Sequence, residues 1–157
     1  MHVTIREAQA ADYEPLCDLL RELNPDDPAP DAHTLDAFER ITGHTDLTLL
    51  VVEAGGQLLA TCYLNVISNL TRGGRPYALI ENVVTRASHR NQGIGKRLLN
   101  HALEHAWSRG CYKVMLLTGS EEATTHAFYR ACGFSGDAKQ GYVIRSTARQ
   151  NHFPREV

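Results

Sequence analysis

A glycine-containing turn between an apolar strand and an amphipathic helix constrains this chain more than any other feature. The strand is predicted over Tyr77 to Thr85, where apolar residues do not simply alternate with polar ones. A strand of this kind is covered on both faces. The helix is predicted over Ile94 to Arg109, because leucine and alanine recur along one side and Gly110 follows. A strand, a tight turn and a packed helix in this order indicate a layered α/β fold.

The turn from Arg90 to Lys96 is suited to holding an anion. A helix start exposes unpaired backbone N–H groups and the positive end of the helix dipole. Glycines without a Cβ allow a phosphate or pyrophosphate to approach the main chain. Two other phosphate motifs are excluded, because Leu98 stands where a Rossmann fingerprint needs its third glycine and Arg97 stands where a P-loop needs serine or threonine. Taken alone, the turn is equally compatible with a glycine-rich helix start that binds nothing.

The rest of the chain adds strands and helices on either side of this unit. Asp31 is predicted to cap a helix that ends before Gly43, and Gly55-Gly56 is predicted to form a hairpin turn. The expected strands cover residues 3–6, 47–53, 58–67, 112–118, 134–138 and 142–146, and the other helices cover residues 11–23, 31–42 and 121–132. This order predicts one α/β domain over residues 1–157, with a core of about 3–146 and a tail at 147–157.

Charge and composition argue against several classes of function. A formal net charge of −2 argues against a general nucleic-acid or anionic-membrane binder. The cysteines form no Cys-x-x-Cys pair, so reduced core thiols are expected. His101 and His105 lie one helical turn apart without a third ligand, so no metal is expected. No signal peptide or membrane span is recognised, and a cytoplasmic location is expected.

Two motifs give the chain a family resemblance. The turn from Arg90 to Gly95 matches the Arg/Gln-x-x-Gly-x-Gly/Ala signature of GNAT (GCN5-related) N-acetyltransferases. The segment from Ala127 to Phe134 resembles the second family motif, in which Phe/Leu-Tyr is followed by three residues and Gly-Phe. The order of predicted elements is also similar to the GNAT fold. The resemblance implies a central mixed, mostly antiparallel, twisted sheet flanked by helices, and an acyl-CoA-dependent N-acetyltransferase that works by direct attack in a ternary complex.

The resemblance also implies a site for acetyl-CoA as cosubstrate. Backbone groups of the strand would pair with the pantetheine arm, and amides of the turn would hold the pyrophosphate. A main-chain N–H near the acetyl carbonyl can polarise it. The implied cofactor-binding residues are Val83, Val84, Thr85, Asn91, Gln92, Gly93, Ile94, Gly95 and Lys96.

Acetyl transfer needs a base for the substrate ammonium and an acid for the departing thiolate. Tyr129 is the predicted acid, because the resemblance places its hydroxyl at the sulfur; the alternative is a core aromatic beside Phe128. Glu81 is the predicted base, because a carboxylate in an apolar strand is costly unless it is paired or solvated. Alternation would place it on one face with Val83. A salt-bridged or rim carboxylate is the alternative, and His126 is another candidate base or a solvated histidine.

The chain departs from the family pattern at two positions. Glu122 stands where many relatives carry an asparagine that contacts CoA, seven residues before the tyrosine. Leu117, in the strand predicted at residues 112–118, stands where some relatives carry a glutamate.

The sequence leaves the acceptor amine open. The acidic loop from Asp26 to Asp31 would attract a cation, whereas Arg72 and Arg75 in a second loop would favour an anion. The stretch from Glu81 to Val84 is similar to that of glucosamine-phosphate acetyltransferases, but it is too short to fix a substrate. Three functions remain: an N-acetyltransferase for a small-molecule or peptide amine, a noncatalytic acyl-CoA-binding sensor or interaction module, and an acyltransferase for longer acyl chains. The resemblance also makes a homodimer an expectation.

Overall fold

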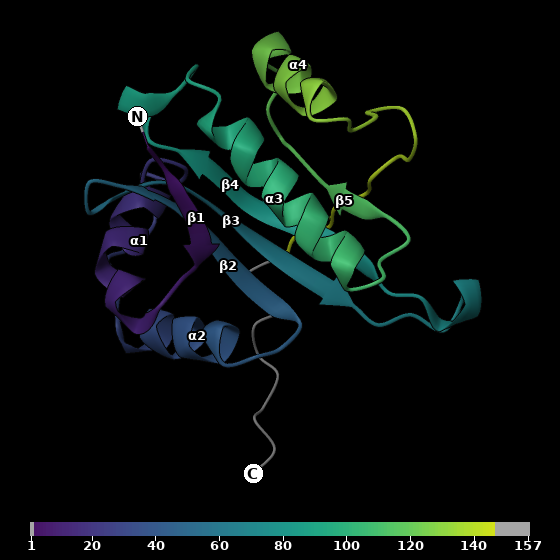
Figure 1. The fold of residues 1–157 in the computed structure, drawn as a ribbon, viewed down its shortest axis with the longest axis horizontal. Helices are drawn as coiled ribbons and strands as arrows, with labels where there is room; N and C mark the ends of the chain where they lie inside the picture. Colours follow the sequence, from purple (N-terminus) through teal and green to yellow (C-terminus); the bar gives the residue numbers. More distant parts are fainter. Residues whose placement is uncertain (1, 147–157) are drawn as a thin grey trace.

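A five-stranded sheet forms the centre of the molecule, in the strand order β1-β2-β3-β4-β5 (Figure 1). The structure is a computed structural model and describes residues 2–146. Neighbouring strands from β1 to β4 are antiparallel, whereas β5 runs parallel to β4. The strands are β1 (Thr4–Glu7), β2 (Leu47–Ala54), β3 (Gln57–Ile67), β4 (Tyr77–Thr85) and β5 (Val114–Leu116). The predicted mixed, mostly antiparallel sheet is confirmed.

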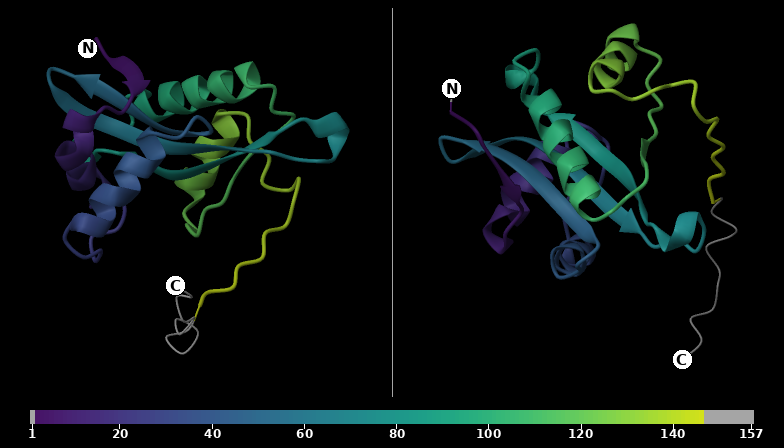
Figure 2. Two further views of the ribbon diagram at one scale, coloured as in Figure 1. Left: turned by 90° about the horizontal axis from the view of Figure 1, so that it is seen from below. Right: turned by 45° about the vertical axis from the view of Figure 1, so that its right-hand side comes forward.

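Helices cover both faces of this sheet (Figure 2). Helices α1 and α2 pack on one face, and α3 packs on the other. Helix α4 contributes Phe128 and Tyr129 to the core on the α3 side. The helices are α1 (Tyr13–Leu20), α2 (Ala32–Thr42), α3 (Ile94–Ser108) and α4 (Ala123–Ala131), with single turns η1 (Ala10–Asp12), η2 (Arg72–Gly74) and η3 (Ala87–His89).

The two covered faces explain why β2 is apolar at nearly every position. Leu50 and Val52 belong to the core under α3, and the intervening Leu49 and Val51 belong to the core under α1 and α2. Successive side chains of a strand point to opposite faces, so a run without polar residues buries apolar area on both. Each large aliphatic side chain buried in this way stabilises the fold by about 1.5–3 kcal/mol relative to exposure.

Asp31 caps α2 as predicted. Its carboxylate accepts hydrogen bonds from the backbone amides of His33 and Thr34, each at 3.0 Å. These amides have no partner inside the helix, so the cap replaces water at the helix start. The Thr34 amide is the main cause that lowers the pKa of Asp31.

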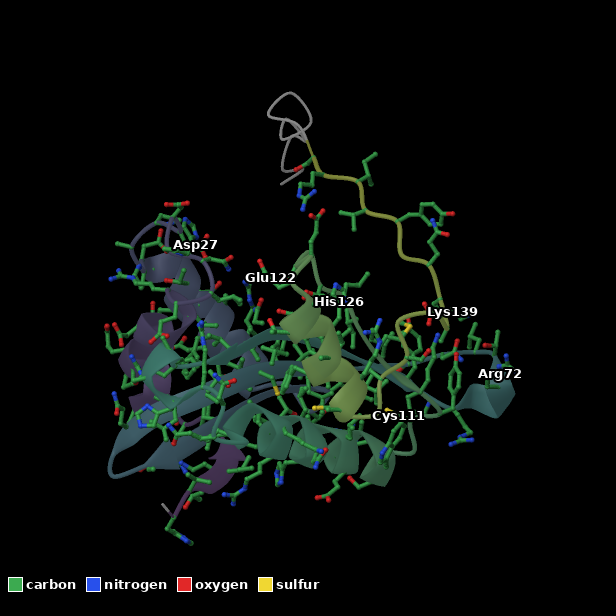
Figure 3. The ribbon with its side chains drawn as sticks, turned by 90° about the horizontal axis from the view of Figure 1, so that it is seen from above. Asp27, Arg72, Cys111, Glu122, His126 and Lys139 are labelled. Carbon is green, nitrogen blue, oxygen red and sulfur yellow. The ribbon has the colours of Figure 1, made fainter. Side chains whose placement is uncertain are left out.

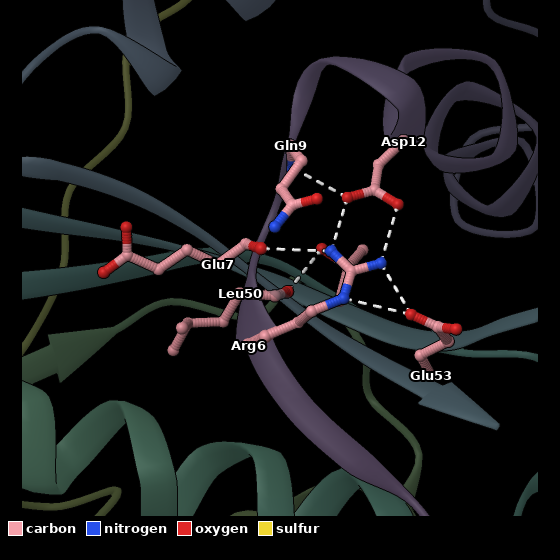
Figure 4. Close-up of polar contacts among 7 residues, drawn as sticks. Arg6, Glu7, Gln9, Asp12, Leu50 and Glu53 are labelled. Carbon is pink, nitrogen blue, oxygen red and sulfur yellow. Dashed lines mark hydrogen bonds and ion pairs between the residues drawn. The ribbon is translucent and has the colours of Figure 1, made fainter.

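Arg6 joins three segments at the outer edge of the sheet (Figure 4). Its guanidinium donates to Asp12, the last residue of η1, at 2.6 and 2.9 Å. It also donates to Glu53 of β2 at 2.6 and 3.0 Å. The Asp12 carboxylate further accepts from the amide of Gln9 at 2.7 Å. Because Asp12 is buried, its charge needs these partners, and the network ties the N-terminal strand to the start of α1.

We expect Asp12→Asn to lower the free energy of unfolding at pH 7 by about 2–3 kcal/mol, because a hydrogen bond to a charged group stabilises a fold more than one between neutral groups. The hydrogen bond from Arg6 is the main cause that lowers the pKa of Asp12 in the folded state. The ionised carboxylate therefore stabilises the fold above the unfolded pKa of about 3.9, and this stability is lost as the pH falls through the lower folded pKa.

Chemical unfolding of the Asp12→Asn variant at several pH values measures this effect. The gap between wild type and variant should be constant from pH 7 to about pH 5 and should shrink in stronger acid. Asp36→Asn is the control, because Asp36 and Arg40 form an exposed pair on α2 and their loss should change nothing measurable. Equal stability of the Asp12→Asn variant and wild type at pH 7 would contradict the assignment.

The two strands predicted at residues 134–138 and 142–146 are not formed. The chain beyond α4 runs away from the body of the molecule (Figure 2), and Tyr142, Val143 and Ile144 are exposed. That prediction was wrong because β-branched and aromatic residues form a strand only against a partner, and no described strand pairs with them. The strand predicted at 112–118 was too long, because β5 covers only Val114–Leu116. These three residues are half-buried. The predicted tail at 147–157 lies outside the described residues.

Three smaller findings concern the class of protein. Among residues 2–146, no helix has the length and apolar character needed to cross a membrane. Cys17, Cys62, Cys111 and Cys132 are free thiols. In the same part of the chain, no three side chains of His, Cys, Asp or Glu gather into a group that could hold a metal ion.

Candidate active site

A bulge interrupts β4 where its pairing with β3 changes register. Tyr63 of β3 lies opposite Glu81, whereas Thr61 lies opposite Val84. β4 therefore contains one more residue than β3 across this step. Asn82 takes up the extra residue with a positive φ of 52°. A bulge bends the strand and changes the face to which the following side chains point.

The bulge separates Glu81 from the residues that follow it. Glu81 lies opposite Tyr63, which packs against the core under α1 and α2. Val83 instead packs against the core under α3, and the Thr85 hydroxyl lies beside Gly95 at the start of α3. The prediction that alternation places Glu81 on one face with Val83 was therefore wrong, because the alternation of side chains does not continue through a bulge.

β4 and β5 pair over only a short stretch. Residues Ala78 to Ile80 pair with Val114 to Leu116, and β5 ends there while β4 continues to Thr85. Among the described residues, no strand lies on that side of the second half of β4. An unpaired strand edge offers N–H and C=O groups to an extended ligand.

The pairing with β3 determines which groups face the open edge. The Arg86 amide donates to Leu59 of β3 at 2.8 Å, so the backbone groups two residues earlier, at Val84, also point toward β3. Those of Val83 and Thr85 point to the open side. The Thr85 carbonyl already accepts from Arg90 Nε at 3.0 Å. The geometry therefore favours Val83 and Thr85 over Val84 as main-chain partners of a ligand.

The turn before α3 presents a row of backbone amides that have no internal partner. Asn91 and Gly93 have positive φ values of 61° and 76°. Alternation of backbone handedness of this kind makes an anion-binding concavity. Within residues 2–146, none of the amides from Asn91 to Lys96 donates a hydrogen bond. The helix dipole and the exposed Lys96 add positive potential, so the turn suits a pyrophosphate.

Gly95 lets the first turn of α3 approach both β4 and α4. A Cβ at this position would lie 3.1 Å from Thr85 Oγ1 and 3.2 Å from the Phe128 ring. Ordinary contacts between carbon atoms are about 3.5–4.0 Å. Gly95 is thus needed for close packing, whereas Gly93 is needed for its backbone conformation.

The end of α4 holds Tyr129 in place. Gly133 has a φ of 92°, and its amide donates to the Arg130 carbonyl at 2.9 Å. The Phe134 amide donates to the Tyr129 carbonyl at 3.1 Å. This is a Schellman cap, in which the residue after the glycine folds back onto the last turn. The Tyr129 ring packs edge-on against Phe134 with centroids 6.3 Å apart, and its centroid is 5.2 Å from that of Phe128.

Tyr129 of α4 and Glu81 of β4 come from different elements, and the Glu81 carboxylate is one of the groups that affect the pKa of Tyr129. Burial is the main cause that raises the pKa of Tyr129, and negative charge on Cys132 and on Glu81 acts in the same direction. The phenol therefore stays protonated well above neutral pH and can donate a proton. The structure places Tyr129 against the core under α3, whereas Glu81 lies opposite Tyr63, which packs against the core under α1 and α2.

Three other candidate positions from the sequence, near α4 and β5, are all at least partly exposed to solvent. His126 and Glu122 both lie toward the start of α4 (Figure 3). His126 is half-buried, and Glu122 is exposed at the N-cap position without a capping hydrogen bond from its side chain. Leu117, just beyond β5, has an exposed fraction of 55%. None of these three positions supplies a buried polar group.

The two oppositely charged loops lie on opposite sides of the molecule. Figure 3 shows Asp27 and Arg72 at its two ends, with α4 between them. Arg72 stacks over the Tyr112 ring at 5.9 Å, and Arg75 donates to carbonyls at the end of α3 at 3.4 Å. Asp31 is occupied as a helix cap. Several of these charges therefore have structural partners, and neither loop alone defines the charge of an acceptor.

Three further residues shape the site but were not predicted from the sequence to do so: Asn82, Arg86 and Glu22. An asparagine inside an apolar strand was a usable signal, because Asn82 tolerates the positive φ that a bulge requires. Arg86 bonds to Glu22, which is 64 positions away in the chain. No local pattern in a single sequence indicates a contact of that range.

The chain is similar to known proteins in sequence and in structure. The model of the acetyltransferase (GNAT) family matches residues 13–134. Glucosamine 6-phosphate N-acetyltransferase 1 of Oryza sativa subsp. japonica is 34% identical over 119 residues, which are 74% of this chain and 70% of that protein. The solved glucosamine-6-phosphate N-acetyltransferase of Arabidopsis thaliana is 25% identical with a TM-score of 0.81, covering 93% of this chain and 100% of that one. A candidate acetyltransferase of Agrobacterium tumefaciens str. C58 is 41% identical with a TM-score of 0.86, covering 91% and 99%.

Proposed function

Because the chain belongs to the GNAT family of acetyltransferases, we propose that it transfers the acetyl group of acetyl-CoA to a primary amine. One observation carries the proposal: the open edge of β4 leads directly to a row of unpartnered amides at the start of α3. An extended thiol arm fits the strand edge, and a pyrophosphate fits the amides. A ligand with both parts, such as CoA, matches this arrangement.

We assign the coenzyme contacts to two groups of main-chain atoms. Val83 and Thr85 pair with the pantetheine arm at the open edge, while Val84 anchors the strand in the core. The amides from Asn91 to Lys96 hold the pyrophosphate, and the buried side chain of Ile94 fixes the turn to the core. The side chain of Lys96 adds a charge at the rim.

The reaction we propose begins with loss of a proton from the substrate ammonium to Glu81, directly or through water. The free amine attacks the thioester carbonyl carbon, and the negative charge on the carbonyl oxygen is stabilised by a main-chain N–H beside the bulge at Asn82. The attacking nitrogen then loses its second proton to solvent as the C–S bond breaks, and the CoA sulfur takes the hydroxyl proton of Tyr129. Proton exchange with solvent restores Tyr129 and Glu81. The role of Tyr129 as the acid is supported by burial, which is the main cause that raises its pKa and keeps the phenol protonated.

Glucosamine 6-phosphate is the acceptor we propose first. The support comes from two relatives named as glucosamine 6-phosphate N-acetyltransferases, which match most of this chain at 34% and 33% identity. The stretch from Glu81 to Val84 is the part of the site whose resemblance to those enzymes is visible in the sequence.

The proposal is tested by measuring thiol release from acetyl-CoA with a panel of amines. Glucosamine 6-phosphate should give the highest kcat/KM, ahead of glucosamine, polyamines, aminoglycosides and short peptides. Glu81→Gln should lower the rate by about 100-fold near neutral pH and should recover as rising pH deprotonates the amine in solution. Acetyl release that does not depend on any added amine would refute the transferase assignment.

The noncatalytic acyl-CoA-binding module is the second candidate. Tight acetyl-CoA binding by wild type and by Tyr129→Phe, with no turnover on the whole amine panel, would favour it. Competition by longer acyl thioesters tests the acyl preference. The homodimer and the cytoplasmic location stay predictions; the mass of the protein in solution tests the first, and the distribution of a tagged protein in cell fractions tests the second.

A further inference from the structure

The segment that follows α1 is bonded to the loop that leads into the phosphate turn. The Glu22 carboxylate accepts from the Ala87 amide at 2.6 Å and from the Arg86 guanidinium at 3.3 Å. The same guanidinium donates to the Leu58 carbonyl of β3 at 3.1 Å and to Asp18 of α1 at 3.1 Å. Arg86 thus joins β3, α1 and Glu22, the second residue after α1.

Glu22 differs from an ordinary surface carboxylate in burial and in the number of its partners. Its side chain is 25% exposed and that of Arg86 is 16% exposed, whereas Asp18 is 67% exposed. One of its oxygens bonds a side chain and the other bonds the main chain. Partly buried charge-assisted bonds are stronger and less screened than exposed ones. Glu22 therefore fixes Ala87 in a way that Asp18 does not.

The bonded amide belongs to the segment that sets the position of the turn. Ala87 begins η3, which ends at His89 immediately before Arg90. Arg90 in turn donates to the Thr85 carbonyl at the open edge of β4. A displacement at Ala87 is therefore passed along a few residues to the amides that are to hold the pyrophosphate.

We propose that Glu22 is a positioning residue that couples the α1–α2 connection to the coenzyme turn. This inference rests on the proposed function, since it assigns the turn to CoA. Glu22 begins the connection that continues through the acidic residues Asp26 and Asp27 to the cap at Asp31. With Glu22 in place, ordering of the turn by CoA also orders this connection, and an acceptor bound beside it meets a segment that is already fixed.

Glu22→Ala should weaken CoA binding by about tenfold, because the Ala87 amide and the Arg86 guanidinium lose a charged partner. The KM for acetyl-CoA should rise by a similar factor, while kcat at saturation stays within about twofold, since no reacting atom is touched. Glu22→Gln should fall in between, because it keeps an oxygen for the Ala87 amide and loses the charge that Arg86 requires.

The coupling is measured by calorimetric titration of CoA with and without glucosamine 6-phosphate, a pair that cannot react because the acetyl group is absent. In wild type the amine should raise the affinity for CoA, and in Glu22→Ala this gain should disappear. Asp18→Ala is the matched control, because it removes an exposed partner of the same guanidinium and should leave both affinity and coupling unchanged.

A Glu22→Ala protein with wild-type CoA affinity and coupling would overturn the inference, even if its thermal stability were lower, because the residue would then have only a structural role. An equal loss of affinity in Asp18→Ala would also overturn it, because the effect would then follow from removing any carboxylate partner of Arg86 and not from Glu22 in particular. If wild type itself bound no CoA, the proposed function would fail and this inference with it.

Discussion

Tyr129→Phe should lower kcat by about 100-fold or more, the range of a lost general acid, while the Kd for CoA stays unchanged. The variant removes only the hydroxyl that is to protonate the CoA thiolate. The phenylalanine ring keeps its packing against Phe128 and Phe134, so the end of α4 should fold as in wild type. Thiol release at saturating substrates gives kcat, and calorimetric titration gives the Kd.

The pH dependence of wild type offers a separate check of the same role. Burial and nearby negative charge raise the pKa of Tyr129 above its ordinary value of about 10, so its hydroxyl stays protonated through the neutral and mildly alkaline range. Loss of activity from ionisation of this acid should therefore appear only above about pH 10. Tyr142→Phe is the control, because that hydroxyl lies on an exposed segment. A Tyr129→Phe enzyme as fast as wild type would mean that water protonates the leaving group.

The parts of this site that the sequence predicts are local in the chain. The turn from Arg90 to Lys96 lies between two regular elements, and the glycines define its conformation without help from distant residues. The cap that holds Tyr129 is also local, because Gly133 and Phe134 complete it within one helical turn. Asp31 at the start of α2 belongs to the same class. Each feature depends on a few neighbouring residues, which a single sequence displays.

The parts that the sequence did not predict depend on partners far away in the chain. The bulge at Asn82 exists only relative to the register of β3, and it moved Glu81 to the face opposite the one expected. β5 pairs with β4 only up to Ile80, before the bulge, and ends at Leu116 although the apolar run continues to Leu117. The same limit applies to Tyr142–Ile144, where strand-forming residues lack a strand beside them.

Gly95→Ala should weaken CoA binding by about 5–150-fold, the equivalent of the roughly 1–3 kcal/mol that overpacking costs. The new Cβ would lie 3.1 Å from Thr85 Oγ1 and 3.2 Å from the Phe128 ring, so the start of α3 must move away from β4 or α4 must move outward. Either movement displaces the amides that are to hold the pyrophosphate. Calorimetric titration of CoA measures the loss, and thermal unfolding shows how much of it is a loss of fold.

Gly93→Ala separates this packing effect from a backbone effect. A Cβ at Gly93 meets no atom within 4 Å, but the residue has a φ of 76°. Its substitution should lower the free energy of unfolding by about 1–2 kcal/mol through left-handed strain alone. Removal of a neighbouring side chain cannot relieve that strain, whereas it can relieve a clash.

A double-mutant cycle with Phe128→Leu therefore distinguishes the two glycines. Leucine at position 128 withdraws the ring atoms that lie 3.2 and 3.4 Å from a Cβ at Gly95, while Thr85 Oγ1 stays at 3.1 Å. The Gly95→Ala/Phe128→Leu variant should therefore regain part of the CoA affinity that Gly95→Ala loses. Gly93→Ala/Phe128→Leu should show no such recovery, because the two losses add. The binding constant, not kcat, is the quantity to compare, since Phe128 also supports the Tyr129 ring. Additive losses in both cycles would show that the approach of α3 to α4 at Gly95 does not govern how the turn holds its ligand.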